Sequence, residues 1–296
     1  MVKPKKKKIR KNKKNHKSVS SPQREEARIG HIPIEQVVVK KAGEAVTYQD
    51  AGQAIFPLMK EARDGTMDLI GTAFFIHYQG IFVTAKHVLM DIYDQEKQEV
   101  THGIFAIQIL PDNHVVQRTL TDFTIHNGAD VAIGRLHPMT HNKTGQFLTN
   151  NVVCLSFEPL KKGDSVITYA YPNTVVQQKE KDGEPNKAFL WPLFYGGVVV
   201  EEYPNGRDKV MLPNPCYQTS MTIHGGASGG PVFNAAGKVC GINSTGYPDM
   251  LDVSFISRIN EILPLQANGI CLSEGAEPTQ VSVMQLIEIG QIKLDG

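Results

Sequence analysis

The chain has 296 residues, of which 41% are hydrophobic and 21% charged, the composition of a globular protein with one large or two modest domains. No apolar run reaches the length of about 18 residues that would predict a membrane-spanning helix. The net charge of +1 hides an uneven distribution, because residues 1–28 carry 12 Lys and Arg and two Glu, whereas the remainder carries 19 basic and 28 acidic residues.

The basic segment 1–28 has too few apolar residues to form a core, so we expect a disordered tail. A secretory signal would continue into an apolar stretch, but Ser18 to Gln23 follow, and we expect no secretion by this route. The lysines at 3–17 predict attraction to nucleic acid or to an anionic membrane surface, or nuclear import in a eukaryote. The alternative is a solvated extension without a partner. Because no aromatic residue lies among the lysines, contact with nucleic acid would be to phosphates.

Short strand-like segments follow the tail, separated by turn sequences such as Asn127-Gly128 and Asn205-Gly206. This pattern is typical of an all-β barrel or sandwich and not of alternating strands and helices. The predicted strands are residues 71–78, 80–88, 103–110, 130–136, 165–171, 196–203, 231–234, 238–244 and 252–257.

Two helices are predicted near the end of the chain. Ser257 could cap a short helix at residues 258–263, which Pro264 would end. The segment 282–292 would place Val283, Leu286 and Ile287 on one helical face, although its pattern fits a strand nearly as well. We expect this segment to pack against the barrel, with partner docking as the alternative.

The four cysteines, Cys154, Cys216, Cys240 and Cys271, are widely spaced and form no CxxC pair, so no zinc site is predicted. Without a secretory signal, we expect reduced thiols that serve packing, as in a cytoplasmic protein. No motif predicts a metal or a cofactor.

The stretch HGGASGGPVF at 224–233 surrounds Ser228 with four glycines. It could be a tight turn, or the G-x-S-x-G elbow of α/β-hydrolases. A serine becomes a nucleophile when an imidazole takes its proton and a carboxylate orients that imidazole. The hydrolase order places the histidine after the serine, but all ten histidines of this chain precede Ser228. The elbow interpretation is therefore excluded.

His87 is the preferred base, because it ends a buried-looking strand that would hold it rigidly yet leave it open at the strand end. Asp130 is the preferred carboxylate, because it opens the apolar segment DVAIGRL and a buried Asp needs a partner such as an imidazole N–H. Asp122 is a weaker alternative. His224 is expected at the rim of a pocket. The other histidines of the globular part are expected at the surface: His77, His102, His114, His126, His137 and His141.

Three motifs in this order resemble those of the chymotrypsin-like (trypsin-like) serine proteases. TAKHV resembles T-A-x-H, DVAIGRL resembles D-[LIV]-A-[LIV], and GASGGPVFN resembles G-x-S-G-G-P-[LV]. The resemblance covers about residues 50–265 and implies two six-stranded antiparallel β-barrels with the active site between them. The expected domains are the tail 1–28, a protease domain 29–268 with barrels at about 50–150 and 151–265, and a C-terminal extension 269–296.

The resemblance implies a role for each matching residue. Ser228 would be the nucleophile, His87 the general base and acid, and Asp130 the residue that orients it. The amides of Gly226 and Ser228 would form the oxyanion hole, which requires backbone angles that glycine adopts. The implied substrate pocket has Thr222 at its base and Ser244, Thr245 and Gly246 in its wall. Asp252 would either point into this pocket or lie exposed, and His224 with Thr222 could favour an acidic side chain.

Two departures from the digestive enzymes are informative. Ala227 replaces the aspartate that pairs with the new N-terminus after zymogen cleavage, and Val88 replaces a disulfide cysteine. In both respects the chain is more similar to bacterial and intracellular members, such as the high-temperature-requirement proteases and the glutamyl endopeptidases. GKVCGINSTG at 237–246 resembles the G-x-V-x-G-I-N of the former.

These observations predict a serine endopeptidase that acts on proteins or peptides through an acyl-enzyme, without metal or cofactor, in the cytoplasm or, in a eukaryote, the nucleus. It could be latent and activated by a protein partner. The alternative is a catalytically silent barrel that binds nucleic acid or an anionic surface through its tail. This alternative is weakened because all three candidate triad residues are present.

Overall fold

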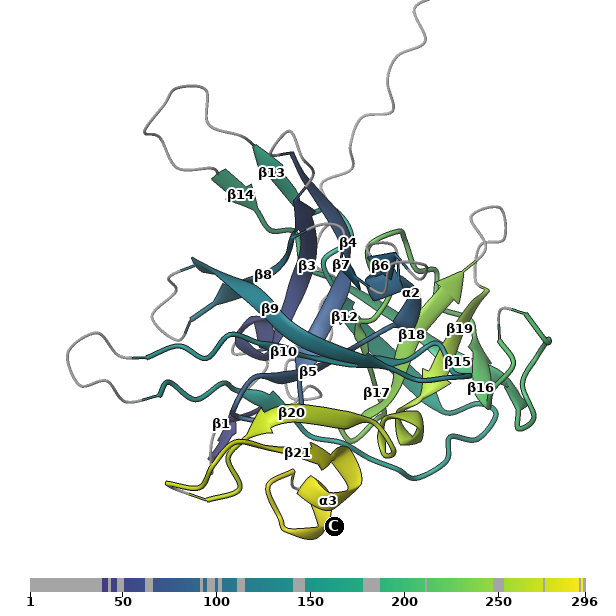
Figure 1. Cartoon of the computed structure of the whole chain (residues 1–296). Helices are drawn as coiled ribbons and strands as arrows, with labels where there is room; N and C mark the ends of the chain where they lie inside the picture. Colours follow the sequence, from purple (N-terminus) through teal and green to yellow (C-terminus); the bar gives the residue numbers. More distant parts are fainter. Residues whose placement is uncertain are drawn as a thin grey trace, which may run out of the picture. The chain divides into compact units, whose positions relative to one another are not determined.

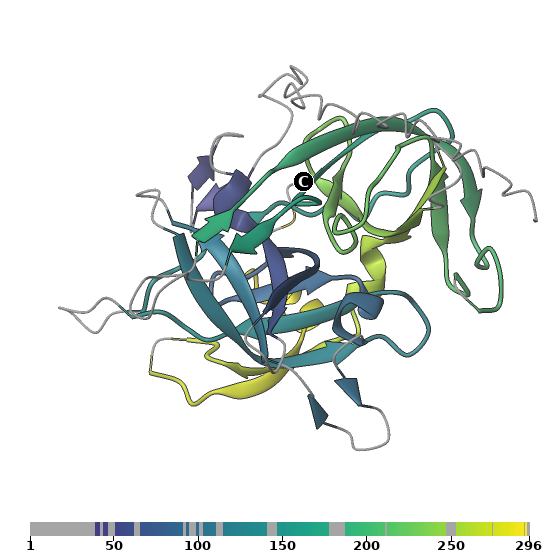
Figure 2. The same cartoon turned by 90° about the horizontal axis from the view of Figure 1, so that it is seen from above.

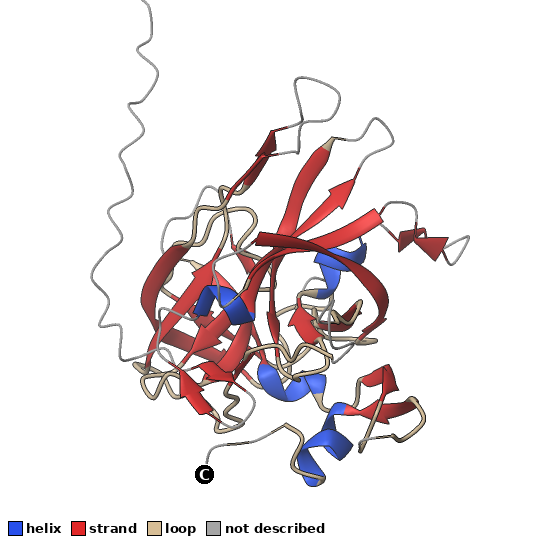
Figure 3. Ribbon diagram, turned by 90° about the vertical axis from the view of Figure 1, so that its left-hand side faces the viewer, coloured by secondary structure: helices blue, strands red, loops and turns tan. Residues whose placement is uncertain are grey.

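The computed structural model describes residues 39–41, 44–46, 51–61, 66–90, 93–94, 99–100, 103–110, 115–140, 147–177, 187–210, 212–246, 253–273, 275–292 and 294. The chain divides into two units, residues 1–30 and 31–296, and all described residues lie in the second. The predicted tail at 1–28 lies outside the described residues. Within the described part strands predominate, joined by loops and a few short helices (Figure 3).

The first barrel is a closed sheet of six antiparallel strands in the order β10-β5-β4-β3-β8-β9 (Figure 1). Its strands are β3 (Ile55–Glu61), β4 (Met67–Phe75), β5 (Ile81–Thr84), β8 (Gly103–Ile109), β9 (Val115–Ile125) and β10 (Ala132–Leu136). All four residues of β5 are buried, so the strand is a continuous apolar run except at Thr84.

The second barrel is also a closed sheet of six antiparallel strands, in the order β12-β15-β16-β19-β18-β17. Its strands are β12 (Ser165–Ala170), β15 (Leu193–Tyr203), β16 (Cys216–Thr219), β17 (Pro231–Phe233), β18 (Val239–Gly246) and β19 (Ser254–Arg258). The two barrels lie side by side in both views (Figures 1 and 2). The predicted fold class, two six-stranded antiparallel barrels, is confirmed.

Smaller elements complete the described fold. Short sheets pair β1 (Val39–Lys41) with β2 (Glu44–Val46) and β11 (Val152–Val153), β6 (Tyr93–Asp94) with β7 (Glu99–Val100), β13 (Val175–Gln177) with β14 (Lys187–Phe189), and β20 (Gln266–Ile270) with β21 (Thr279–Ser282). The helices are α1 (Ala51–Ala54), α2 (Lys86–Met90), the 3₁₀ helix η3 (Ile259–Ile262) and α3 (Val283–Glu288). None of these helices is both long and apolar enough to cross a bilayer.

Both helices predicted near the C-terminus are present, but one cap was assigned wrongly. Helix η3 begins after Arg258, which makes no side-chain cap, whereas Ser257 belongs to β19. Helix α3 has a complete capping box, in which Ser282 Oγ accepts from the Gln285 amide and the Gln285 side chain accepts from the Ser282 amide. This cap resolves the ambiguity between helix and strand in favour of a helix after Ser282.

One hydrophobic cluster joins the two barrels and the C-terminal segment. It contains Phe74 and Ile133 of the first barrel, Ile167 and Phe233 of the second, and Leu286 of α3. The predicted packing of the C-terminal segment against the barrels is therefore confirmed for α3. Cys154, Cys216 and Cys240 are also buried, as a packing role predicts, whereas Cys271 is partly exposed; none of the four forms a disulfide.

The segment from β20 to α3 is fastened to the first barrel by polar contacts (Figure 1). Thr124 Oγ1 donates to the carbonyl of Gln266 at 2.7 Å, and Asn268 Nδ2 donates to Asp122 Oδ2 at 2.7 Å. Asp122, the weaker candidate for the orienting carboxylate, therefore binds the C-terminal segment, and Asp130 holds His87, as described below.

His77 was expected at the surface, and this expectation is wrong because its side chain is fully buried. Its Nδ1 accepts from the Gln79 amide at 3.2 Å, so the proton is on Nε2, which donates to Gln291 Oε1 at 2.9 Å. Burial lowers the pKa of His77 to about 4, although the bond to Gln291 acts in the opposite direction. The C-terminal segment thus covers the β4–β5 turn and depends on a neutral histidine.

This burial predicts a loss of stability in mild acid. The unfolded chain takes up a proton at His77 near pH 6.5, but the folded chain resists protonation until about pH 4. The free energy of unfolding should fall as the pH drops through this window, by at most about 1.4 kcal/mol per pH unit for one proton. Chemical denaturation between pH 7 and pH 4 measures this slope. His77→Gln should flatten it, whereas the exposed control His137→Gln should not; equal slopes in both variants would contradict the prediction.

Candidate active site

His87 and Asp130 lie at the same end of two paired strands. Strand β5 ends at Thr84, which pairs with Ala132 at the start of β10. His87 follows on the first turn of α2, and not on a strand as predicted, while Asp130 precedes β10. Both side chains therefore lie at the same end of the first barrel.

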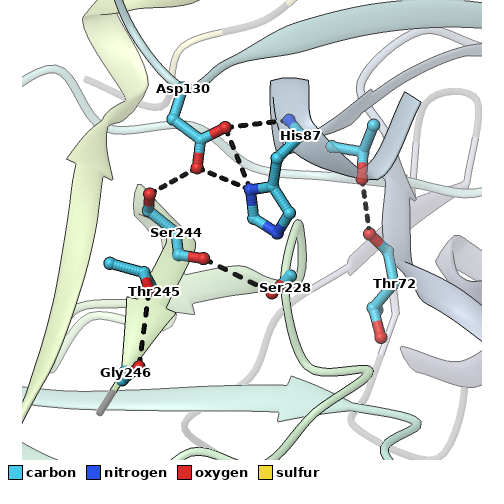
Figure 4. Close-up of polar contacts among 8 residues, drawn as sticks. Thr72, His87, Asp130, Ser228, Ser244, Thr245 and Gly246 are labelled. Carbon is cyan, nitrogen blue, oxygen red and sulfur yellow. Dashed lines mark hydrogen bonds and ion pairs between the residues drawn. The ribbon is translucent and has the colours of Figure 1, made fainter. Parts of the chain in front are cut away.

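The Asp130 carboxylate binds His87 in three ways (Figure 4). The backbone amide of His87 donates to Oδ1 at 3.0 Å, and Nδ1 of the ring lies 3.0 Å from Oδ1 and 2.9 Å from Oδ2. With the Nδ1 proton directed at the carboxylate, Nε2 is the basic nitrogen of the ring. In Figure 4 this edge of the ring points away from Asp130 and toward Ser228.

Asp130 also receives a hydrogen bond from the second barrel, because Ser244 Oγ on β18 donates to Oδ2. Burial is the largest influence on the pKa of Asp130 and acts to raise it. The hydrogen bonds and charge of His87, together with the bond from Ser244, outweigh burial and hold the pKa below its usual value. The carboxyl group is therefore ionised at neutral pH. Its side chain is 13% exposed, against 49% for His87.

Ser228 lies in the loop that leads into β17, and the first barrel holds this loop on both sides of Ala227. The amide of Thr72 on β4 donates to the carbonyl of Ser228 at 2.8 Å, and Thr72 Oγ1 donates to the carbonyl of Gly226 at 2.8 Å. Thr72 is fully buried. The hydroxyl of Ser228 donates to the carbonyl of Ser244 at 3.3 Å, so Ser244 contacts both Ser228 and Asp130.

The backbone amides of this loop differ in whether they donate a hydrogen bond. Those of Ala227, Gly229 and Gly230 donate to backbone carbonyls at 3.1, 2.8 and 3.0 Å. The amides of Gly226 and Ser228 donate to no group in the described part of the chain. Gly226 has φ +87°, which turns its peptide in a way that glycine favours. Two unused amides beside a serine hydroxyl can bind an anion that forms on a carbonyl attached to that serine.

The predicted pocket residues fall into two neighbouring segments, 222–224 and 244–246. A Cβ on Gly246 would lie 3.3 Å from the side chain of Ile223, so the segments are in contact. Thr222, Thr245 and Gly246 are partly exposed, and the ring of exposed His224 lies 5.5 Å from that of Tyr195. Asp252 lies outside the described residues, so its predicted alternatives stay open.

Sequence reasoning missed Thr72 and Asn243, and it missed the contact of Ser244 with Asp130. Asn243 is fully buried, and its Nδ2 donates to Thr168 Oγ1 at 2.7 Å and to the carbonyl of Ala227 at 3.2 Å. The G-I-N stretch that suggested the bacterial relatives contains this asparagine, but no local pattern showed which carbonyl it supports.

Comparison with known proteins identifies related sequences and folds. The family model of the trypsin-like peptidase domain matches residues 71–242, more than half of the chain. Among curated proteins the sequence has no match. The crystal structure of Deg5 is similar with a TM-score of 0.50 and 19% identity, over 72% of this chain and 87% of that one, which shows a shared fold.

Two other solved structures are also similar. The Rv3671c protease from M. tuberculosis, in its active form, has a TM-score of 0.49 and 16% identity, over 84% of this chain and 86% of that one. The HtrA-type protease AlgW with a decapeptide has a TM-score of 0.47 and 15% identity, over 72% of this chain and 62% of that one.

Adjacent glycines provide a matched test of the two unused amides. In Gly226→Ala the new Cβ would lie 2.5 Å from Leu69 Cδ2 at a positive φ, so the peptide should rotate and the amide should move. Labelling of Ser228 by a fluorophosphonate, whose adduct needs the same donors, should slow by about 10²–10³. Gly225→Ala has no atom within 4 Å of its Cβ and should label normally. Equal labelling rates in the two variants would contradict this role of Gly226.

Proposed function

Because the chain belongs to the trypsin-like peptidase family and is therefore a serine peptidase, we propose that it cleaves within polypeptide chains through a triad of Ser228, His87 and Asp130. The observation that carries the proposal is the convergence of these residues: Asp130 binds the Nδ1 side of the His87 ring, and Ser244 contacts both Asp130 and Ser228. A loop with two unused amides surrounds the serine.

In the proposed reaction Ser228 Oγ attacks the carbonyl carbon of the substrate while His87 Nε2 takes its proton. The substrate oxygen becomes an anion, which the amides of Gly226 and Ser228 stabilise. His87 then gives the proton to the leaving amine as the C–N bond breaks, which leaves an ester on Ser228. Water attacks this ester with His87 again as base, and His87 then returns the proton to Ser228 Oγ as the ester C–O bond breaks and the acid product leaves. Throughout, the ionised Asp130 stabilises the protonated imidazole and holds its orientation.

We propose that this loop needs no pairing with a new N-terminus. Ala227 carries no charge, is fully buried, and its carbonyl accepts from Asn243 Nδ2 and from the Gly230 amide. These bonds and those of Thr72 support the loop from within the fold. Latency with activation by a protein partner stays a prediction, and it would appear as probe labelling that requires the partner.

We propose that specificity comes from the segments 222–224 and 244–246. Thr222 has no carboxylate with which to select Arg or Lys, and His224 with Thr222 could favour an acidic side chain. Cleavage of a peptide library, with Ser228→Ala as the control, identifies the preferred residue.

The basic tail supports a second, compatible proposal. With 12 Lys and Arg against two Glu in residues 1–28, it would recruit the peptidase to nucleic acid or an anionic surface, in the cytoplasm or, in a eukaryote, the nucleus. A purely binding function is less well supported, because the candidate triad is complete.

The triad is tested by two substitutions with different expected effects. Ser228→Ala should abolish fluorophosphonate labelling and peptide cleavage, because the attacking atom is removed. Asp130→Asn should keep the size of the side chain but present an amide to His87, and kcat should fall by about 10⁴. Single-site labelling and steady-state kinetics measure these effects. Labelling that persists in Ser228→Ala would refute the assignment.

Deletion of residues 1–28 separates recruitment from catalysis. The truncated protein should keep the kcat/KM of the full chain on a short uncharged peptide, because the proposed catalytic residues His87, Asp130 and Ser228 all lie outside the tail in the sequence. It should lose salt-sensitive binding to polyanions. Cleavage assays and nucleic-acid binding at two salt concentrations make the comparison. If peptide cleavage disappeared with the tail, the division of roles would be wrong.

A further inference from the structure

The turn between β9 and β10, residues 126–130, places Asp130 next to His87. Within this turn the amides of Gly128 and Ala129 donate to Nδ1 of His126, at 3.1 and 2.7 Å. They have no other acceptor in the described part of the chain. The His126 ring therefore closes the turn immediately before the carboxylate, in the way that Asx and Ser/Thr side chains close turns elsewhere.

The same ring faces a carboxylate from the other half of the chain. Because Nδ1 accepts two amide protons, the ring proton is on Nε2, which lies 3.6 Å from Glu261 Oε2. Both side chains are largely buried, with 19% and 17% exposed. Glu261 lies on η3, directly after β19 of the second barrel. A carboxylate at this position fixes the ring orientation and thereby the position of Nδ1.

A residue from another segment of the second barrel also contacts Glu261 and the turn. Asn214, in the β15–β16 connection, donates from Nδ2 to Glu261 Oε2 at 3.5 Å. It also lies against the turn, because a Cβ on Gly128 would be 2.6 Å from Asn214 Oδ1. The turn that presents Asp130 is thus held against two segments of the second barrel.

We propose that His126, oriented by Glu261, is a positioning residue that fixes the turn carrying Asp130 and so keeps the His87 imidazole in its catalytic orientation. This inference rests on the proposed triad. It differs from the surface role that the sequence suggested for His126. The Asp130–His87 contacts of 2.9–3.0 Å come from a single carboxylate, so a displaced turn would misalign the base. Asp130 contacts the segment 244–246 through the hydroxyl of Ser244, so the expected effect on substrate binding is smaller than the effect on the base.

The test compares kcat, KM and thermal unfolding for His126→Ala, His126→Asn and the exposed control His137→Ala. His126→Ala should lower kcat about 10- to 100-fold, a typical effect of losing a partner that orients an active group, with KM changed by less than about twofold. His126→Asn should recover most of kcat, because its amide oxygen can accept from the same two amides. His137→Ala should match the wild-type protein.

Glu261→Ala probes the pair without removing the acceptor of the turn, and it also serves if His126→Ala does not fold. It should lower kcat in the wild-type background and add nothing in His126→Ala, because the two residues act as one unit. Unchanged kcat in His126→Ala or in Glu261→Ala, or parallel losses of kcat and thermal stability that His126→Asn does not rescue, would overturn the inference. A wild-type protein that is not labelled at Ser228 would instead refute the proposed function, so the two failures are distinguishable.

Discussion

The carboxylate of Asp130 imposes the strictest requirement in this structure, because a largely buried anion must receive hydrogen bonds wherever water cannot reach it. Its donors are the amide and ring of His87 in the first barrel and the hydroxyl of Ser244 in the second. A buried group left without its hydrogen-bond partner typically costs about 1–3 kcal/mol, and more when the group is charged. The same bonds that stabilise the folded chain therefore fix the distance between the strand carrying Ser244 and the helix carrying His87.

A second set of hydrogen bonds between the two barrels involves no charged group. Thr72 of β4 binds the serine loop through its amide and its hydroxyl, and its carbonyl accepts from Thr84 Oγ1 at 2.8 Å. The loop lies so close to β4 and β5 that a Cβ on Gly229, at φ +83°, would lie 2.3 Å from the Thr72 carbonyl oxygen and 2.0 Å from Thr84 Oγ1. Glycine at 229 is therefore required by the approach of the two barrels, as well as by the local turn. These contacts support the proposal that the loop needs no ion pair at Ala227.

The fold and the residues of the proposed triad could be identified from the sequence because their signals are local. TAKHV and DVAIGRL each contain a functional residue beside its strand, and GASGGPVFN contains the serine loop itself. Strands β3, β9 and β16 were not among the segments named from the sequence. In β3, Pro57 is unusual for a central strand, and a register shift lies next to it between Leu58 and Met59. Thr72 was missed because its partner Gly226 is 154 residues away, a distance at which no sequence pattern indicates a contact.

His77 and His126 were both expected at the surface, and the two side chains differ from that expectation for the same reason. Each is covered by a chain segment that follows the strands of the second barrel. Gln291 covers His77, and Glu261 faces His126. The first barrel has its six strands by residue 136, but the Nε2 atoms of these two histidines meet side chains from beyond residue 258. Histidine is suited to such positions because one nitrogen accepts amide protons while the other donates to a distant side chain. Polar residues that looked like surface residues in the first half of the chain therefore serve as attachment points for the last part, and the orientation of Asp130 depends on the complete fold.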